Sequence, residues 1–421
     1  MFSLLIAYRS FIRQRRRSIL SAAAISLSLA LMLVFVGFAD DGHTRMAEIG
    51  IRLGAGHVLV QGSGYQERQT LDLVVPDPAE VVATARLLPH VTDAVVRVNS
   101  GGLLQAGELS SAVLVSGVDP HLEPQVSTVA SADHRVSGDY LRARQDMPFT
   151  QGPADIYLGA DLADRLEVGL GDRVVLTVSP RGTAEPSSAA FRVRGTFRTG
   201  LRELDGGAAQ IPLGEAQRLF DLGQSATQVA VMVDELDRSD ATAAALAASL
   251  GPHSGLEVLG WKVALRELYE AIVLDDLSMY LMMAIVFVVV AIGIFNTVLM
   301  SVAERTRELG VMMAIGTSKG QLFGIVLAEA AVLAVVAAAI GVGLGLMGHG
   351  YIATHGIDVG ALAGGNYELA GITIGGKLYS RLSVGVVVRW TLVVIGLVIA
   401  SATYPAWRAS RLEPVEAMRH V

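Results

Sequence analysis

The chain has 421 residues, of which 52% are hydrophobic and 17% are charged, with a formal net charge of −7 and a mean hydropathy of +0.49. Soluble domains rarely combine so large an apolar fraction with so few charges. The absence of cysteine excludes disulfides, thiolate catalysis and Cys-ligated zinc. Because the apolar residues gather in a few long runs, the sequence predicts a membrane protein with one sizeable aqueous domain.

Four apolar runs are long enough to span a bilayer, which takes about 20 residues of helix. The predicted transmembrane helices cover residues 19–40, 276–302, 322–347 and 384–405. The first run follows a basic segment and could be a signal peptide. It is longer than a typical signal core, however, and no A-x-A cleavage site closes it, so we interpret it as a membrane anchor.

Basic residues cluster in the segments that four spans would place on one side of the membrane. These residues are Arg9, Arg13, Arg15, Arg16, Arg17, Arg305, Arg307, Lys319, Arg408, Arg411 and Arg419. By the positive-inside rule that side is cytoplasmic, and both termini lie there. The cytoplasmic segments are then a basic amphipathic helix at 1–18, a loop at 303–321 and a tail at 406–421, while 41–275 and 348–383 lie outside.

The long outer segment, 41–275, alternates strand-like and helical patterns, which predicts an α+β domain. Strand patterns begin at 56–62, and the predicted helices cover 78–88, 159–166, 213–219 and 241–250. We expect an inserted subdomain at about 121–224. The flanks of the neighbouring spans have helical periodicity and either form a stalk or pack on the base of the domain. The segment has 31 acidic and 19 basic residues, which argues against nucleic-acid binding and favours a role in solubility.

No motif for catalysis, metal binding or nucleotide binding is found. The sequence has no G-x-x-x-x-G-K-[ST] phosphate loop, no H-E-x-x-H and no G-x-S-x-G. His43 and His57 lack a third ligand nearby, and we interpret His349 and His355 as solvent-facing. We therefore expect no catalytic residue, no metal and no cofactor in this chain.

The cytoplasmic loop carries a dense group of charges. Glu304, Arg305, Arg307 and Glu308 fall within little more than one helical turn, and the spacing of the two glutamates predicts that they share one face. Gly310 and Gly316 permit chain bends or close packing on either side of the loop. Such a short charged helix is suited to docking a soluble motor protein. A solvated connector that obeys the positive-inside rule is the alternative.

Two long motifs closely resemble the permease family that contains the MacB-type exporters, the lipoprotein-releasing permeases and FtsX. The first is an N-T-x-x-M-S-V-x-E-R-T-R-E-[IL]-G-x-x-x-A-[IL]-G string, matched at Asn296, Thr297, Met300, Ser301, Val302, Glu304, Arg305, Thr306, Arg307, Glu308, Gly310, Ala314 and Gly316. The second is the C-terminal ending, matched at Pro405, Ala406, Arg408, Ala409, Arg411, Pro414, Glu416, Ala417 and Arg419. The resemblance covers the membrane part and is loose in the outer domain.

The resemblance implies a specific organisation. A MacB-type periplasmic core on a helical stalk would stand outside the inner membrane of a bacterium, and two permease copies, identical or related, would pair with a cytoplasmic ABC ATPase that holds ATP and Mg²⁺. The ATPase-coupling residues would be Glu304, Arg305, Thr306, Arg307, Glu308, Gly310 and Gly316. Because only 18 residues precede the first span, we expect the ATPase to be a separate chain, as in the lipoprotein-releasing permeases.

The family also sets the expected activity. ATP-driven motion would pass through the spans to the periplasmic domain, a process called mechanotransmission, and would extract or expel a lipoprotein, lipid, peptide or drug. A periplasmic adaptor or carrier protein and membrane lipids are the further expected partners, and nucleic acid is not. The alternative is an FtsX-like regulator that controls a periplasmic partner without transporting a substrate.

Two polar residues within the predicted spans are assigned to the membrane interface and to helix packing. Glu329 lies about seven residues into the third span, where a carboxylate costs about 2.5–3.5 kcal/mol on insertion scales. We expect it to make an interhelical hydrogen bond or a dimer contact, because a proton relay would need partners that the sequence lacks. Asn296 in the second span is given the same packing role.

Overall fold

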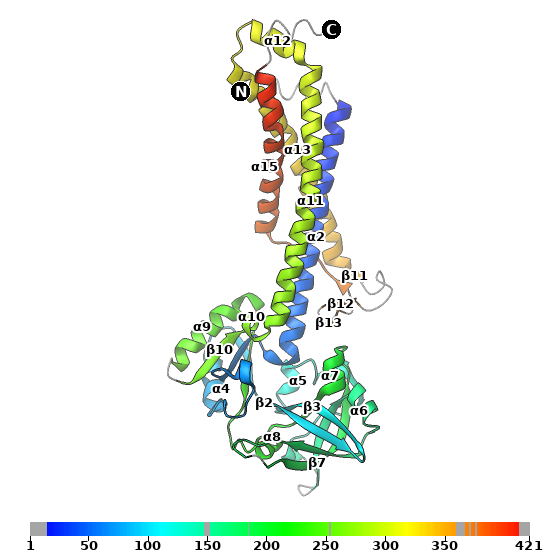
Figure 1. Cartoon of the computed structure of the whole chain (residues 1–421), viewed down its shortest axis with the longest axis vertical. Helices are drawn as coiled ribbons and strands as arrows, with labels where there is room; N and C mark the ends of the chain where they lie inside the picture. Colours follow the sequence, from blue (N-terminus) through cyan, green and yellow to red (C-terminus); the bar gives the residue numbers. More distant parts are fainter. Residues whose placement is uncertain are drawn as a thin grey trace. The chain divides into compact units, whose positions relative to one another are not determined.

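A computed structural model describes residues 15–146, 152–183, 185–251, 254–358, 367–369, 372–374 and 377–411. The chain divides into a membrane unit (1–43, 273–364 and 376–421) and a domain unit (44–272 and 365–375), both shown in Figure 1. Most of the predicted basic helix at 1–18 and most of the tail at 406–421 lie outside the described residues.

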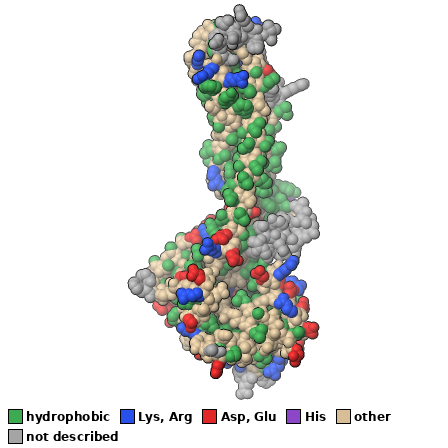
Figure 2. Space-filling model, viewed as in Figure 1, with side chains coloured by type: hydrophobic (Ala, Val, Ile, Leu, Met, Phe, Trp, Pro, Cys, Tyr) green, Lys and Arg blue, Asp and Glu red, His purple; other side chains and the backbone are tan. Residues whose placement is uncertain are grey.

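The membrane unit is built on four helices that are long and apolar enough to cross a bilayer. They are α2 (Arg15–Gly50), α11 (Arg266–Glu304), α13 (Lys319–His355) and α15 (Val384–Ser410). Each contains one predicted span. In addition, α2 and α11 continue as helix through the flanking segments in which the sequence showed helical periodicity. Figure 2 shows hydrophobic side chains over these helices and charged side chains over the domain unit.

The four helices pack through small residues, which let helix backbones approach closely in the membrane. A side chain at Gly341 of α13 would place its Cβ 2.8 Å from the carbonyl oxygen of Ser26 in α2. At the same contact, the Ser26 hydroxyl donates a hydrogen bond of 2.8 Å to the Ala337 carbonyl. Around this contact lies a core from α2, α11, α13 and α15 made of Ala22, Ile25, Leu29, Leu33, Ile294, Leu333, Ala334, Ala337, Ala338, Val394 and Val398.

The domain unit contains a ten-stranded mixed sheet in the order β10-β1-β9-β2-β3-β8-β5-β7-β4, with β6 paired to β2 and β7. The strands are β1 (Val58–Gly62), β2 (Val91–Ala106), β3 (Leu109–Val118), β4 (Arg135–Gly138), β5 (Ala154–Gly159), β6 (Arg173–Val178), β7 (Ser187–Phe197), β8 (Ala208–Pro212), β9 (Gln228–Val233) and β10 (Leu256–Gly260). The helices are α3 (Tyr65–Arg68), α4 (Pro78–Arg86), α5 (Glu123–Val126), α6 (Ala160–Arg165), α7 (Arg202–Gly207), α8 (Leu213–Leu219), α9 (Ser239–Leu250) and α10 (Trp261–Ala264). Four membrane helices with an α+β domain confirm the predicted fold class.

Shorter elements complete the described chain. Single turns of helix lie at η1 (Ile51–Ala55), η2 (Ala132–His134), η3 (Arg144–Asp146) and η4 (Leu236–Arg238). Two small antiparallel pairs join β11 (Ile357–Asp358) to β14 (Lys377–Leu378) and β12 (Tyr367–Leu369) to β13 (Ile372–Ile374).

Two larger hydrophobic cores of the domain meet at β2, and a third, smaller core includes Val118, Tyr157 and Phe197. One core joins β1, β9, α4 and α9 and includes Val58, Val60, Val81, Val229 and Leu246. The other lies among β5, β6, β7, β8 and α8, but it also takes in Val98 and Leu104 of β2 and Val113 and Val115 of β3. The subdomain expected at 121–224 therefore draws on β2 and β3 for its core, and β2 is long enough to serve both cores.

Candidate functional site

A break in the helix at Arg305 forms the start of the charged loop. Arg305 leaves helical geometry with φ −106° and ψ 15°, and α12 (Thr306–Ala314) begins at the next residue. The Thr306 hydroxyl donates to the Ala303 carbonyl at 2.8 Å and to the Val302 carbonyl at 3.2 Å. The Val302 carbonyl also accepts from the Arg305 N–H at 3.2 Å, so both carbonyls are satisfied at the break. The loop thus contains the expected short helix. Because the break lies between Glu304 and Glu308, the helical spacing that predicted a shared face does not apply to them.

Local capping chemistry ends α12 and starts α13. Gly316 has φ +104°, a conformation that favours glycine, and the Thr317 N–H donates to the Met312 carbonyl at 3.0 Å. Ser318 then caps α13 in a reciprocal pair with Gln321. Gly310, by contrast, lies inside α12 and is buried, so its role is close packing.

The two faces of α12 differ sharply. The buried face contributes Leu309 to a core with Val302, Leu322, Val326, Ala406 and Ala409, which fixes α12 on the adjoining ends of α11, α13 and α15. On the other side Glu304, Arg307 and Glu308 are exposed, together with Val311 and with Ile315, whose exposed fraction is 79%. The spacing of Arg307, Val311 and Ile315 by four residues indicates this mixed face, although the motif drew attention only to the charges.

Arg305 lies on the inner side of this loop. Its Nη1 is 2.7 Å and 2.9 Å from the two carboxylate oxygens of Glu329 in α13, and its Nε donates to Glu308 at 3.1 Å. Burial lowers the pKa of Arg305, but the attraction of Glu329 and then of Glu308 outweighs it, so the net shift is upward and the guanidinium stays charged. The sequence grouped Arg305 with residues that face an ATPase, whereas its contacts tie α12 to α13. Glu329 of α13 thus has Arg305, at the helix break, as its partner, while a dimer contact of Glu329 stays a prediction.

Asn296, which the sequence assigns to the membrane interface and to helix packing, keeps that assignment as a prediction. It is exposed on α11, while the adjacent Thr297 makes the contact with α2 through a hydrogen bond of 3.2 Å from the Ser21 hydroxyl. Two adjacent helical positions point about 100° apart, so Asn296 and Thr297 face different surroundings.

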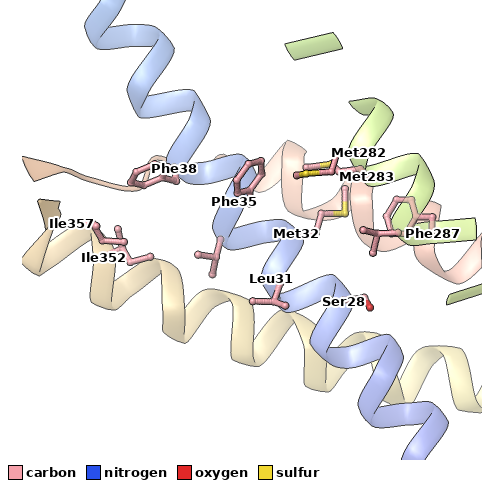
Figure 3. Close-up of a pocket in the computed structure, with 12 residues that line it drawn as sticks. Ser28, Leu31, Met32, Phe35, Phe38, Met282, Met283, Phe287, Ile352 and Ile357 are labelled. Atoms are coloured by element: carbon pink, nitrogen blue, oxygen red, sulfur yellow. The ribbon is translucent and has the colours of Figure 1, made fainter. Parts of the chain in front are cut away.

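An apolar cavity of about 590 Å³ lies between α2 and α11 in the membrane unit (Figure 3). Leu31, Met32 and Phe35 of α2 and Met283 and Phe287 of α11 line it. The flexible thioethers and aromatic rings suit a surface that adapts to apolar ligands. No charged side chain is among the described residues that line the cavity.

The histidines do not form a metal site in the described part of the chain, where no group of three potential His, Cys, Asp or Glu ligands occurs. His349 lies 2.8 Å from the Ser380 hydroxyl, and His355 stacks on Tyr351 with ring centroids 4.4 Å apart. His57 is buried in the domain unit.

Four membrane helices, an α+β domain between the first two of them and a short helix between the second and third define a multi-pass membrane permease with a large extracytoplasmic domain. The model of the MacB-like periplasmic core domain matches residues 18–249, which is more than half of the chain, and the model of the FtsX-like permease C-terminal region matches residues 280–414. The chain therefore belongs to the MacB/FtsX family of ABC transporter permeases.

Two curated relatives illustrate the range of the family. The lipoprotein-releasing system transmembrane protein LolC of Xylella fastidiosa is 24% identical over 416 residues, covering 95% of this chain and 92% of that protein. The macrolide export ATP-binding/permease protein MacB of Nitrobacter winogradskyi is 31% identical over 277 residues, covering 63% of this chain and 38% of that protein. Among solved structures, the periplasmic region of MacB from Actinobacillus actinomycetemcomitans aligns over 52% of this chain and 95% of that chain, with 14% identity and a TM-score of 0.36.

Proposed function

We propose that this chain is the permease subunit of an ATP-driven transporter, and that α12 is the element through which a cytoplasmic ABC ATPase moves it. The observation that carries the proposal is the two-faced geometry of α12. One face is fixed to the ends of three membrane helices, and the other presents Arg307 and Val311 to solvent. Glu304 before α12 and Ile315 directly after it are exposed as well. A helix so mounted can take up force from a docked protein and pass it into the spans. ATP and Mg²⁺ would be held by the ATPase.

The membrane orientation belongs to the same proposal. The basic residues of the loop at α12 and of the segment after α15 favour a cytoplasmic position for both, with both termini inside and the domain unit in the periplasm. A separate ATPase chain is supported by the two relatives. This chain aligns over 92% of LolC, which is named a transmembrane protein, but over 38% of MacB, which is named an ATP-binding/permease protein.

We infer further that nucleotide-driven closure of two ATPases on a permease dimer moves the periplasmic domains by mechanotransmission.

The cargo class that the geometry favours is one with an apolar part, because the cavity between α2 and α11 is lined almost entirely by aliphatic, thioether and aromatic side chains. A lipoprotein or a free lipid fits this lining best, and the name of the LolC relative points the same way. An apolar peptide or drug would satisfy the same chemistry. A periplasmic adaptor or carrier would receive the cargo.

The docking role of α12 predicts a large loss of coupling on charge reversal. In the double variant E304K/E308K, the ATP turnover that the permease stimulates should fall at least tenfold, because two exposed carboxylates become cations on the docking face. Turnover is measured in the reconstituted permease–ATPase complex. The matched control, E108K/E185K, makes the same charge change at exposed residues of the domain unit and should keep full stimulation. Equal turnover in the two variants contradicts the proposal.

A further inference from the structure

Two polar clasps hold α13, one near each end. The first is the bidentate contact of Arg305 with Glu329, which ties the start of α13 to the loop that carries α12. The second lies in residues 379–381, between β14 and α15, which we call the strap. Its Ser380 hydroxyl is 2.8 Å from Nδ1 of His349 in α13. Through Ser380 the strap is therefore attached to α13.

The other side of the strap is fixed on α2. The Arg381 N–H donates to the Gly37 carbonyl at 2.8 Å, and the Tyr379 N–H donates to the Asp41 carboxylate at 3.0 Å. Arg381 adds an ion pair of 3.3 Å with the same carboxylate, whose side chain is 4% exposed. A buried charge is held in place only when its partners are retained. Asp41 therefore fixes the strap to a defined position on α2.

The fit between the strap and α2 leaves no free space at Gly37. A Cβ there would lie 2.4 Å from the Ser380 hydroxyl and 3.0 Å from the Arg381 carbonyl oxygen. A methyl group there must displace the Ser380 hydroxyl from its position beside His349, and it also presses on the Arg381 carbonyl of the strap. Five residues further along the same helix, a Cβ at Gly42 would meet nothing within 4 Å. The helix itself thus offers a matched pair of glycines for an experiment.

Between its clasps, α13 is a stiff element packed on α2. Glu329 and His349 are separated by 20 residues of uninterrupted helix, a length of about 30 Å. Gly341 and Gly345 bring its backbone against Ser26, Ala30 and Leu33 of α2. A displacement at Arg305 therefore reaches α2 along a rigid, continuously packed path.

We propose that α13 is the strut of this permease: the Arg305–Glu329 clasp takes up the displacement of α12, and the strap at 379–381 delivers it to α2. Arg305, Glu329, Asp41 and Gly37 are then positioning residues for coupling, none of them in contact with the ATPase or the cargo. This assignment rests on the proposed function, in which α12 receives the ATPase. The strut assignment adds that the displacement of α12 reaches α2 through α13. The direct path along α11 operates as well.

The test uses the full permease–ATPase complex in nanodiscs. Because the chain has no cysteine, E48C gives a single spin-label site on α2. The distance between the labels in two permease copies is measured by electron–electron resonance before and after trapping with ATP and vanadate, and basal ATP turnover is measured in parallel. Without further substitution, the distance distribution should shift on trapping.

Breaking either clasp should reduce this shift to half or less while turnover continues. G37A and the exposed-residue variant R381Q test the strap, and E329Q tests the inner clasp. G42A is the matched control and should show the full change in label distance on trapping. The charge swap R305E/E329R should recover more of this distance change than R305E or E329R alone. A full shift in R381Q and E329Q overturns the strut. An absent shift in the unsubstituted complex overturns instead the proposed ATPase-driven motion on which the strut rests.

Discussion

Replacing Arg97 by methionine should lower the free energy of unfolding of the periplasmic domain by about 3–5 kcal/mol, the usual effect of removing one partner of a buried ion pair. Arg97 of β2 faces Glu123 of α5, with Nη2 2.7 Å from Oε1 and Nε 3.1 Å from both carboxylate oxygens. The side chains are 4% and 2% exposed. The guanidinium also donates to the carbonyl of Gly54 in η1. Without Arg97, the buried carboxylate of Glu123 and the half-buried carbonyl of Gly54 lose this donor together.

The expected loss in the free energy of unfolding is larger for the buried Arg97–Glu123 pair than for an ion pair at the surface. R266M removes a partner of Glu270 from a pair whose side chains are 78% and 60% exposed, and such pairs contribute at most about 1 kcal/mol. Unfolding of the full chain is followed by urea titration with circular dichroism in the near ultraviolet. The double variant R97M/E123L should recover part of the loss, because it leaves no unpaired charge. A change below about 1 kcal/mol in R97M contradicts a structural role for the pair.

The membrane part of the fold follows from sequence with little ambiguity, because hydrocarbon imposes one solution on an apolar run of about 20 residues. The continuation of α2 to Gly50 follows from helical periodicity in the same way. The break at Leu265 between α10 and α11 does not, because the periodic pattern runs through it. The order of the strands in the sheet could not be predicted from such local patterns. Each strand pattern is local, while the pairing of β1 with β9 and β10 joins residues far apart in the chain.

The candidate site shows the same division between local and distant contacts. Glu304, Arg307 and Glu308 are exposed, as charged residues of a polar loop usually are. The inward role of Arg305 was not predictable, because it depends on a break between two helices and on the distance to Glu329. The strap was missed for the same reason: Asp41 and Arg381 are ordinary charges in the sequence, and only the fold brings them together.

Acidification should weaken the periplasmic domain through His57. Burial, followed by the nearby positive charge of Arg52, lowers the pKa of His57 from 6.5 to about 4. Above pH 6.5 the imidazole is neutral in both the folded and the unfolded chain. Between pH 6.5 and pH 4 only the unfolded chain takes up the proton, so the free energy of unfolding falls as the pH falls. Allowing for water near the ring, the loss is about 2 kcal/mol at pH 4.5.

The contacts of His57 explain why the folded domain resists the proton. The Val233 N–H points at Nδ1 from 3.4 Å, so a proton on that atom would face another donor. H57N keeps an acceptor there but cannot titrate, and should therefore flatten the acid-dependent loss. Hydrogen exchange of β1, corrected for its intrinsic pH dependence, measures the effect in the full chain. H121N, at an exposed histidine, should keep the original slope. If H57N and H121N lose stability with the same slope between pH 6.5 and 4.5, His57 does not carry the acid sensitivity.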